Sequence, residues 1–61
     1  MYVDFAKTSG GYVCETLSVH QGVIIPRIGE KVYLKGNNWI VEDVYHVIEE
    51  SKVIIYLDQN Y

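Results

Sequence analysis

The chain has 61 residues, a net charge of −3 and a single cysteine. This length allows one small domain spanning residues 1–61, and one cysteine excludes a disulfide within the chain. The acidic excess disfavours nucleic-acid binding, and no apolar run approaches the roughly 20 residues that cross a bilayer. We therefore expect a cytoplasmic domain of small stability margin, which self-association would help to stabilise.

The N-terminal third predicts a β-hairpin. Residues Tyr2–Thr8 alternate apolar and polar side chains, which is typical of a strand. The glycines of Ser9–Gly11 suit a tight turn, and Tyr12–Val19 return as a second strand. The polar segment His20–Gly22 ends this strand.

The next segment contains the only proline. The apolar run Val23–Ile25 stops at Pro26, which has no N–H for a central strand ladder. Residues Arg27–Glu30 predict a turn in which Gly29 tolerates an unusual backbone conformation. Lys31–Lys35 alternate again and predict a strand with its tyrosine on the face opposite to its valine and leucine.

The C-terminal half predicts two further strands. A hairpin loop is expected at Gly36–Asn38, because Gly and Asn adopt left-handed conformations most easily. A long strand follows at Trp39–Ile48, then a turn at Glu49–Lys52 and a last strand at Val53–Leu57.

The long strand has an alternative interpretation. Part of its apolar spacing also fits a helix, so one short helix at residues 39–50 remains open. The many β-branched and aromatic residues favour a strand. Alternation fails at Glu42-Asp43, where a β-bulge would restore it. The bulge would keep four apolar side chains on one face: Trp39, Val41, Val44 and Ile48.

These elements predict an all-β domain, a small antiparallel barrel or strongly curled sheet of about five strands. The pattern apolar-Pro-x-x-Gly-x-x-Val, a hairpin and then Trp-x-Val, over about Ile25–Leu57, resembles SH3-like small barrels. It also resembles short proteins often encoded by phages and prophages. The resemblance rests on spacing alone, so it carries over no catalytic or binding residue.

The residues that could perform chemistry do not form a known motif. Cys14 in a strand is typical of a small core residue, and His20 and His46 are too few and too far apart for a metal site. Adjacent acids in a strand point to opposite faces and do not converge. The glycine-rich turns lack phosphate-loop spacing. We therefore expect no enzymatic activity, no metal and no cofactor.

The six tyrosines are the strongest indication of a binding surface. Tyr33 and Tyr56 lie opposite the core residues of their strands, and Tyr45 joins them if the bulge is present. Ile54 shares this face, which predicts a partner-binding patch. The alternative is that the N-terminal hairpin covers the patch and makes it a second core layer.

Three basic residues offer a different site. Arg27, Lys31 and Lys35 fall within nine positions, and both lysines share the parity of Tyr33. Positive charge beside an aromatic ring could hold a phosphate or nucleotide. Lysines also protect the edge strands of sheets, which is the interpretation favoured here.

The sequence thus predicts a non-enzymatic binding module that engages a protein partner, without a membrane or nucleic acid. It also predicts self-association, with a homodimer the simplest form. The phage resemblance implies an accessory protein or an inhibitor of a host protein. The alternative is a small-molecule or nucleotide binder whose pocket forms at an oligomer interface, using Arg27, Lys31, Lys35 and Tyr33.

Overall fold

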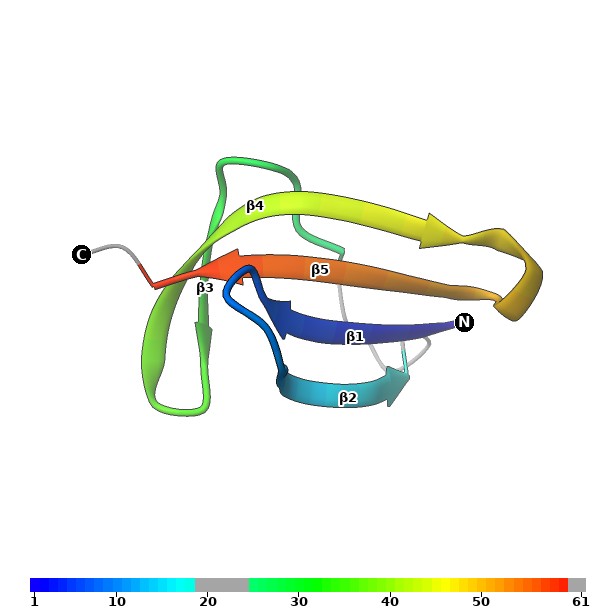
Figure 1. Ribbon diagram of the computed structural model, residues 1–61, viewed down its shortest axis with the longest axis horizontal. Coiled ribbons are helices and arrows are strands. Elements are labelled where there is room, and N and C mark those ends of the chain that lie inside the picture. Colours follow the sequence, from blue (N-terminus) through cyan, green and yellow to red (C-terminus); the bar gives the residue numbers. More distant parts are fainter. Residues whose placement is uncertain (19–24, 60–61) are drawn as a thin grey trace.

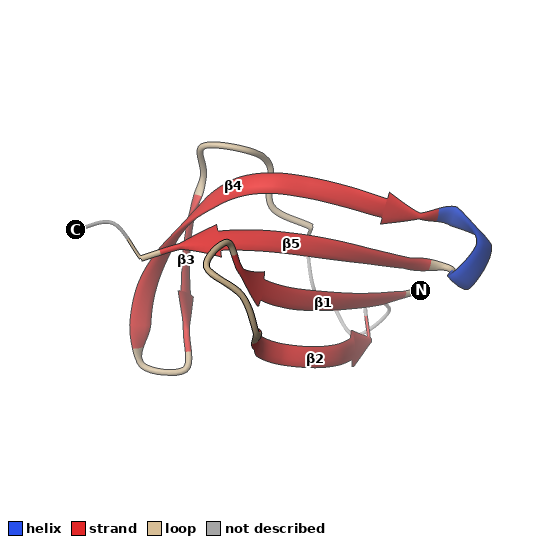
Figure 2. Ribbon diagram, viewed as in Figure 1, coloured by secondary structure: helices blue, strands red, loops and turns tan. Residues whose placement is uncertain are grey.

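The computed structural model describes residues 1–18 and 25–59, with the backbone alone for residues 15–18. It contains five strands and a one-turn 3-10 helix, η2 (Ile48–Glu50) (Figures 1 and 2). The strands are β1 (Tyr2–Lys7), β2 (Tyr12–Ser18), β3 (Lys31–Leu34), β4 (Asn37–Val47) and β5 (Lys52–Asp58). The expected break at His20–Gly22 and the start of the apolar run before Pro26 lie outside the described residues.

The strands form one sheet in the order β2-β1-β5-β4-β3, curled into a half-barrel. This confirms the predicted all-β class. Three of the neighbouring pairs are antiparallel, but β1 and β5 run parallel, which the expectation of a purely antiparallel sheet did not include. The first and last strands of the chain are therefore neighbours in the middle of the sheet (Figure 1).

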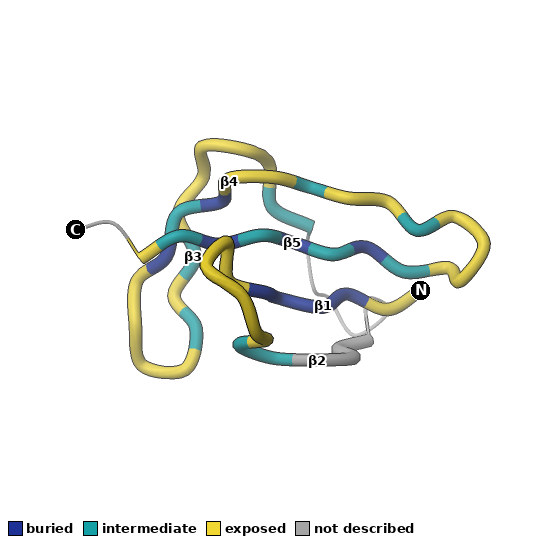
Figure 3. Tube along the Cα trace, viewed as in Figure 1, coloured by how far each residue is buried: buried dark blue, intermediate teal, exposed yellow. Residues whose placement is uncertain are grey.

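The core lies on the inner face of the curled sheet. Alternate residues of β1 and β5 are in register, so that Val3 lies beside Val53 and Phe5 beside Ile55. These four side chains are buried, and the dark segments of Figure 3 follow them along β1 and β5. The rest of the core comes from β4 and the end of β5: Trp39, Val41 and Leu57.

The predicted β-bulge is present in β4. Val41 pairs with Leu57 and Asp43 with Tyr56, so Glu42 is the extra residue. The bulge returns Val44 to the inner face with Val41, because one added residue shifts the alternation by one step. Ile48 does not join this face: it begins η2 and is 80% exposed. The helical alternative for residues 39–50 is wrong, since β4 runs as a strand to Val47.

The turn before β3 is fixed by its own end residues. The Glu30 N–H donates to the Arg27 carbonyl at 3.0 Å, and the Glu30 carboxylate accepts from the Arg27 N–H at 2.7 Å. Gly29 has φ +92°, as the predicted turn requires. The Gly29 N–H also donates to the Val41 carbonyl at 2.9 Å, which attaches the turn to β4.

The hairpin between β3 and β4 turns one residue earlier than predicted. Leu34 pairs with Asn37, so the loop is Lys35-Gly36, with φ values of +54° and +77°. Positive φ at both central residues defines a type I′ turn, whose twist matches that of the flanking strands. The predicted loop at Gly36–Asn38 is therefore displaced, and its two asparagines belong to β4.

The conformation of this turn predicts how two substitutions change the free energy of unfolding. The left-handed conformation of Lys35 is sterically unfavourable for a residue with a long side chain. Type I′ turns favour Asn-Gly at their two central positions. We expect Lys35→Asn to raise the free energy of unfolding by about 0.5–1 kcal/mol, and Gly36→Ala to lower it by about 1 kcal/mol. Urea unfolding followed by Trp39 fluorescence measures both changes. Equal stabilities for the two variants would contradict the turn assignment.

Candidate protein-binding surface

The register of the sheet puts every described tyrosine on its outer face, opposite the core. Paired residues on neighbouring strands point to the same side of a sheet. Ala6 pairs with Tyr12 on β2 and with Tyr56 on β5, and Tyr45 pairs with Ile54. We define the tyrosine face by these outer residues: Tyr2, Tyr12, Tyr33, Tyr45, Ile54 and Tyr56.

The face has a compact centre and one distant member. Tyr45, Ile54 and Tyr56 are neighbours on β4 and β5, as the sequence predicted. Tyr45 is 58% exposed, whereas Ile54 and Tyr56 are half-buried. Tyr33 is 72% exposed but lies on the edge strand β3, so it shares the face without joining this centre.

The N-terminal hairpin extends the sheet instead of covering the tyrosine face. Strand β1 hydrogen-bonds to β5, and β2 follows as the outermost strand on that side (Figure 1). The alternative of a second core layer therefore does not hold for this hairpin. Its two tyrosines, Tyr2 and Tyr12, add to the face with about half of each side chain exposed.

Sequence reasoning did not associate these two tyrosines with the others. The sequence shows which side chains share a face within one strand. It does not show which faces of two separate strands lie on the same side of the sheet until their pairing is known. The parallel β1–β5 pair supplies that connection. A buried acid on the same face was missed for the same reason: Asp4 is only 5% exposed.

Asp4 is held by a lysine from the neighbouring strand. The Lys52 Nζ lies 3.5 Å from the Asp4 carboxylate and 3.4 Å from that of Glu50. Burial lowers the pKa of Lys52, but hydrogen bonds and attraction to Glu50 and Asp4 together raise it above its ordinary value of 10.5. The protonated Lys52 amine therefore contributes fully to folding stability below pH 10.5. This contribution is lost as the pH rises through the raised pKa of Lys52.

The basic residues considered for a phosphate site lie on β3 and in the turns at its two ends. The Arg27 side chain is exposed and its Nε lies 3.9 Å from the Glu30 carboxylate. Lys35 is in the hairpin turn, and Lys31 shares β3 with Tyr33. Because β3 is an edge strand, the placement of Lys31 agrees with protection of that edge.

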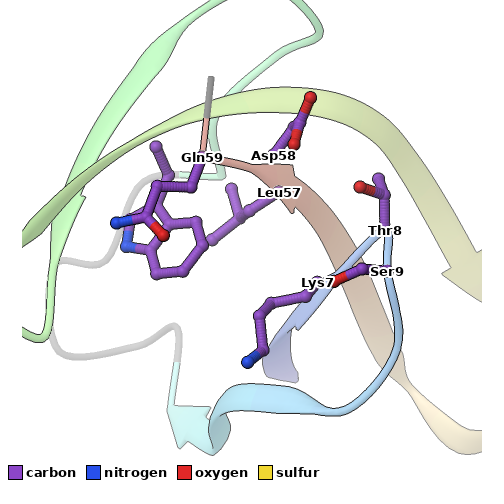
Figure 4. A pocket seen from close by; sticks show the side chains of 7 residues that line it. Lys7, Thr8, Ser9, Leu57, Asp58 and Gln59 are labelled. Atoms are coloured by element: carbon purple, nitrogen blue, oxygen red, sulfur yellow. The ribbon is translucent and has the colours of Figure 1, made fainter. Parts of the chain in front are cut away.

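The surface hollows of the described residues include the following two. One, of about 310 Å³, lies between the β1–β2 turn and the end of β5, with Lys7, Thr8 and Ser9 facing Leu57, Asp58 and Gln59 (Figure 4). The other, of about 300 Å³, surrounds η2 and is largely apolar. Neither is lined by Arg27, Lys31, Lys35 or Tyr33, whose site was expected at an oligomer interface.

The described thiol and imidazole groups, those of Cys14 on β2 and His46 on β4, lie on strands that are not neighbours. Cys14 is half-buried against the core, and His46 is exposed opposite Val53 on β5. His20 lies outside the described residues. Within residues 1–18 and 25–59, no three His, Cys, Asp or Glu side chains are grouped so as to hold a metal ion.

Comparison with protein-family models, curated proteins and solved structures gives no match to this chain. The SH3-like and phage resemblance therefore stays a prediction, and function must be inferred from the surface itself. The described part of the chain contains no helix long and apolar enough to cross a membrane.

Proposed function

We propose that this protein is a non-enzymatic binding module that engages a protein partner through the tyrosine face. The observation that carries the proposal is the placement of five tyrosines on one side of a sheet whose other side is the core. Tyrosine brings a large contact area at a small cost in side-chain entropy, and its hydroxyl can bond at a wet rim. Tyr45, Ile54 and Tyr56 form the centre of this surface.

The edges of the sheet support a second part of the proposal, self-association into a homodimer. Strands β2 and β3 end the strand order, so each has one side without a strand partner in the described sheet. Such edges can pair with a second chain, and a domain of 61 residues gains stability from doing so. The cytoplasmic setting and the phage-type role of blocking or redirecting a host protein belong to the same proposal.

The test begins with capture of the partner. The purified protein is mixed with a lysate of the cells that produce it, and native mass spectrometry identifies stoichiometric complexes. The partner is then purified, and its dissociation constant is measured with the wild type and with Tyr45→Ser. Loss of a central aromatic residue typically costs about 2 kcal/mol or more, so we expect the dissociation constant to rise at least about 30-fold.

Ile28→Ser is the matched control, because Ile28 is 64% exposed in the turn before β3 and is not on the tyrosine face. It should leave the dissociation constant within about twofold of the wild type, since surface changes outside an interface have small effects. If Tyr45→Ser and Ile28→Ser bind the partner equally, or no protein is retained at all, the proposal is wrong.

A further inference from the structure

Acidic residues lie beside Tyr56, the tyrosine on the middle strand of the sheet. Asp43 is the register partner of Tyr56 on β4, and Asp58 is two residues further along β5 on the same side. Residues two apart in a strand are about 7 Å apart, so both acids adjoin Tyr56 on the outer face of the sheet. Asp43 is exposed and Asp58 is half-buried.

The β-bulge adds a third acid at this position. Two residues of β4, Glu42 and Asp43, stand against the single residue Tyr56. The Val44 N–H donates to the Asp43 carboxylate at 2.9 Å, which limits the freedom of that side chain before anything binds. Without the bulge, only one acid of β4 would stand opposite this tyrosine.

The three acids form no ion pair with a described basic side chain. The ion pairs found among the described residues join Arg27 to Glu30 and Lys52 to Asp4 and Glu50. None includes Glu42, Asp43 or Asp58. Among the described residues, these acids are also not grouped so as to hold a metal ion.

We propose that the partner presents arginine side chains to Tyr56 and Tyr45, an inference that rests on the proposed function of the tyrosine face. A guanidinium group is planar, stacks on an aromatic ring and forms paired hydrogen bonds with a carboxylate. Aromatic rings bordered by acids complement that group in both shape and charge. The same acids repel phosphates, so the surface selects a basic protein segment over a nucleic acid.

The experiment uses the intact protein labelled with ¹⁵N and a short peptide with arginine at alternate positions, separated by serine and glycine. Backbone amide shifts are followed during titration at low salt. Saturable shifts should concentrate in β4 around Asp43 and in β5 around Tyr56. A control peptide has citrulline in place of every arginine, because citrulline has nearly the shape of arginine without its charge. This peptide should bind at least about tenfold more weakly than the arginine peptide.

Two charge-matched variants decide whether the site is specific. Glu42→Gln/Asp43→Asn and Glu49→Gln/Glu50→Gln each remove two negative charges, but only the first pair adjoins Tyr56. The first variant should bind the arginine peptide at least about fivefold more weakly than the wild type. The second should lose less than about twofold in affinity. Equal losses would mean that net charge alone attracts the peptide, and would overturn the inference.

Other outcomes also overturn it. Equal binding of the citrulline peptide, absence of saturable shifts with the arginine peptide, or tighter binding of a single-stranded oligonucleotide would each do so. These failures differ from failure of the proposed function. If the Tyr45→Ser variant fails to bind a captured partner that the Glu42→Gln/Asp43→Asn variant still binds, the tyrosine face binds a protein. In that case it does not recognise arginine side chains on that protein.

Discussion

Ile55→Ala should remove a large part of the protein's free energy of unfolding. Ile55 is fully buried in β5, between Phe5 on β1 and Val44 on β4. Truncating a buried isoleucine costs about 2–5 kcal/mol, through lost burial and the cavity that remains. A chain of 61 residues is expected to have only about 3–9 kcal/mol of stability, so the loss is comparable to the whole.

Ile48→Ala makes the same chemical change at a residue that is 80% exposed in η2, and serves as the control. It should change the free energy of unfolding by no more than about 0.5 kcal/mol. Circular dichroism during thermal unfolding compares the two variants. A cooperative transition for Ile55→Ala within a few degrees of the wild type would show that this strand is not the centre of the core.

Deleting Glu42 should leave the protein folded, whereas deleting Ile54 should abolish the fold. Glu42 is the extra residue of the bulge, and without it Val41, Asp43 and Val44 alternate regularly between the inner and outer faces. A one-residue deletion elsewhere in a paired strand moves every following side chain to the wrong face. Strand β5 pairs on both sides, so removing Ile54 disrupts two ladders.

The two deletions are equal in size, which makes the comparison direct. We expect the Glu42 deletion to change the free energy of unfolding by about 1 kcal/mol, because a bulge alters twist more than pairing. The dispersion of amide signals in an NMR spectrum distinguishes a folded chain from an unfolded one. An unfolded Glu42 deletion would mean that the bend at the bulge is needed to close the half-barrel.

Local patterns in the sequence were sufficient to predict the strands and the bulge. The alternation of Val32, Tyr33 and Leu34 gave the orientation of β3, and the adjacent acids Glu42 and Asp43 marked the break in β4. These features depend on neighbours in the chain, whose side-chain directions are fixed by the two-residue period of a strand.

Long-range pairing could not be predicted from the same patterns. Nothing local to Tyr2–Lys7 indicates that this strand lies parallel to β5, and the burial of Asp4 depends on that pairing. Strand β2 shows the same limit: Tyr12 and Cys14 share parity in the sequence, yet Tyr12 pairs with Ala6 and Cys14 with Phe5. A register shift between these pairs turns the two side chains to opposite faces.

We propose that the tyrosine face is open in the free protein and is covered by a protein partner in the complex. The most direct measurement is the accessibility of each tyrosine ring to a soluble paramagnetic probe, with the ring signals assigned by substitution. In the free protein the rings of Tyr2, Tyr12 and Tyr45 should broaden strongly, while the buried Trp39 should not. Binding of the captured partner should protect Tyr45 and Tyr56. If the rings of Tyr2, Tyr12 and Tyr45 are protected in the free protein, or if the partner leaves Tyr45 and Tyr56 unprotected, the tyrosine face is not the binding surface.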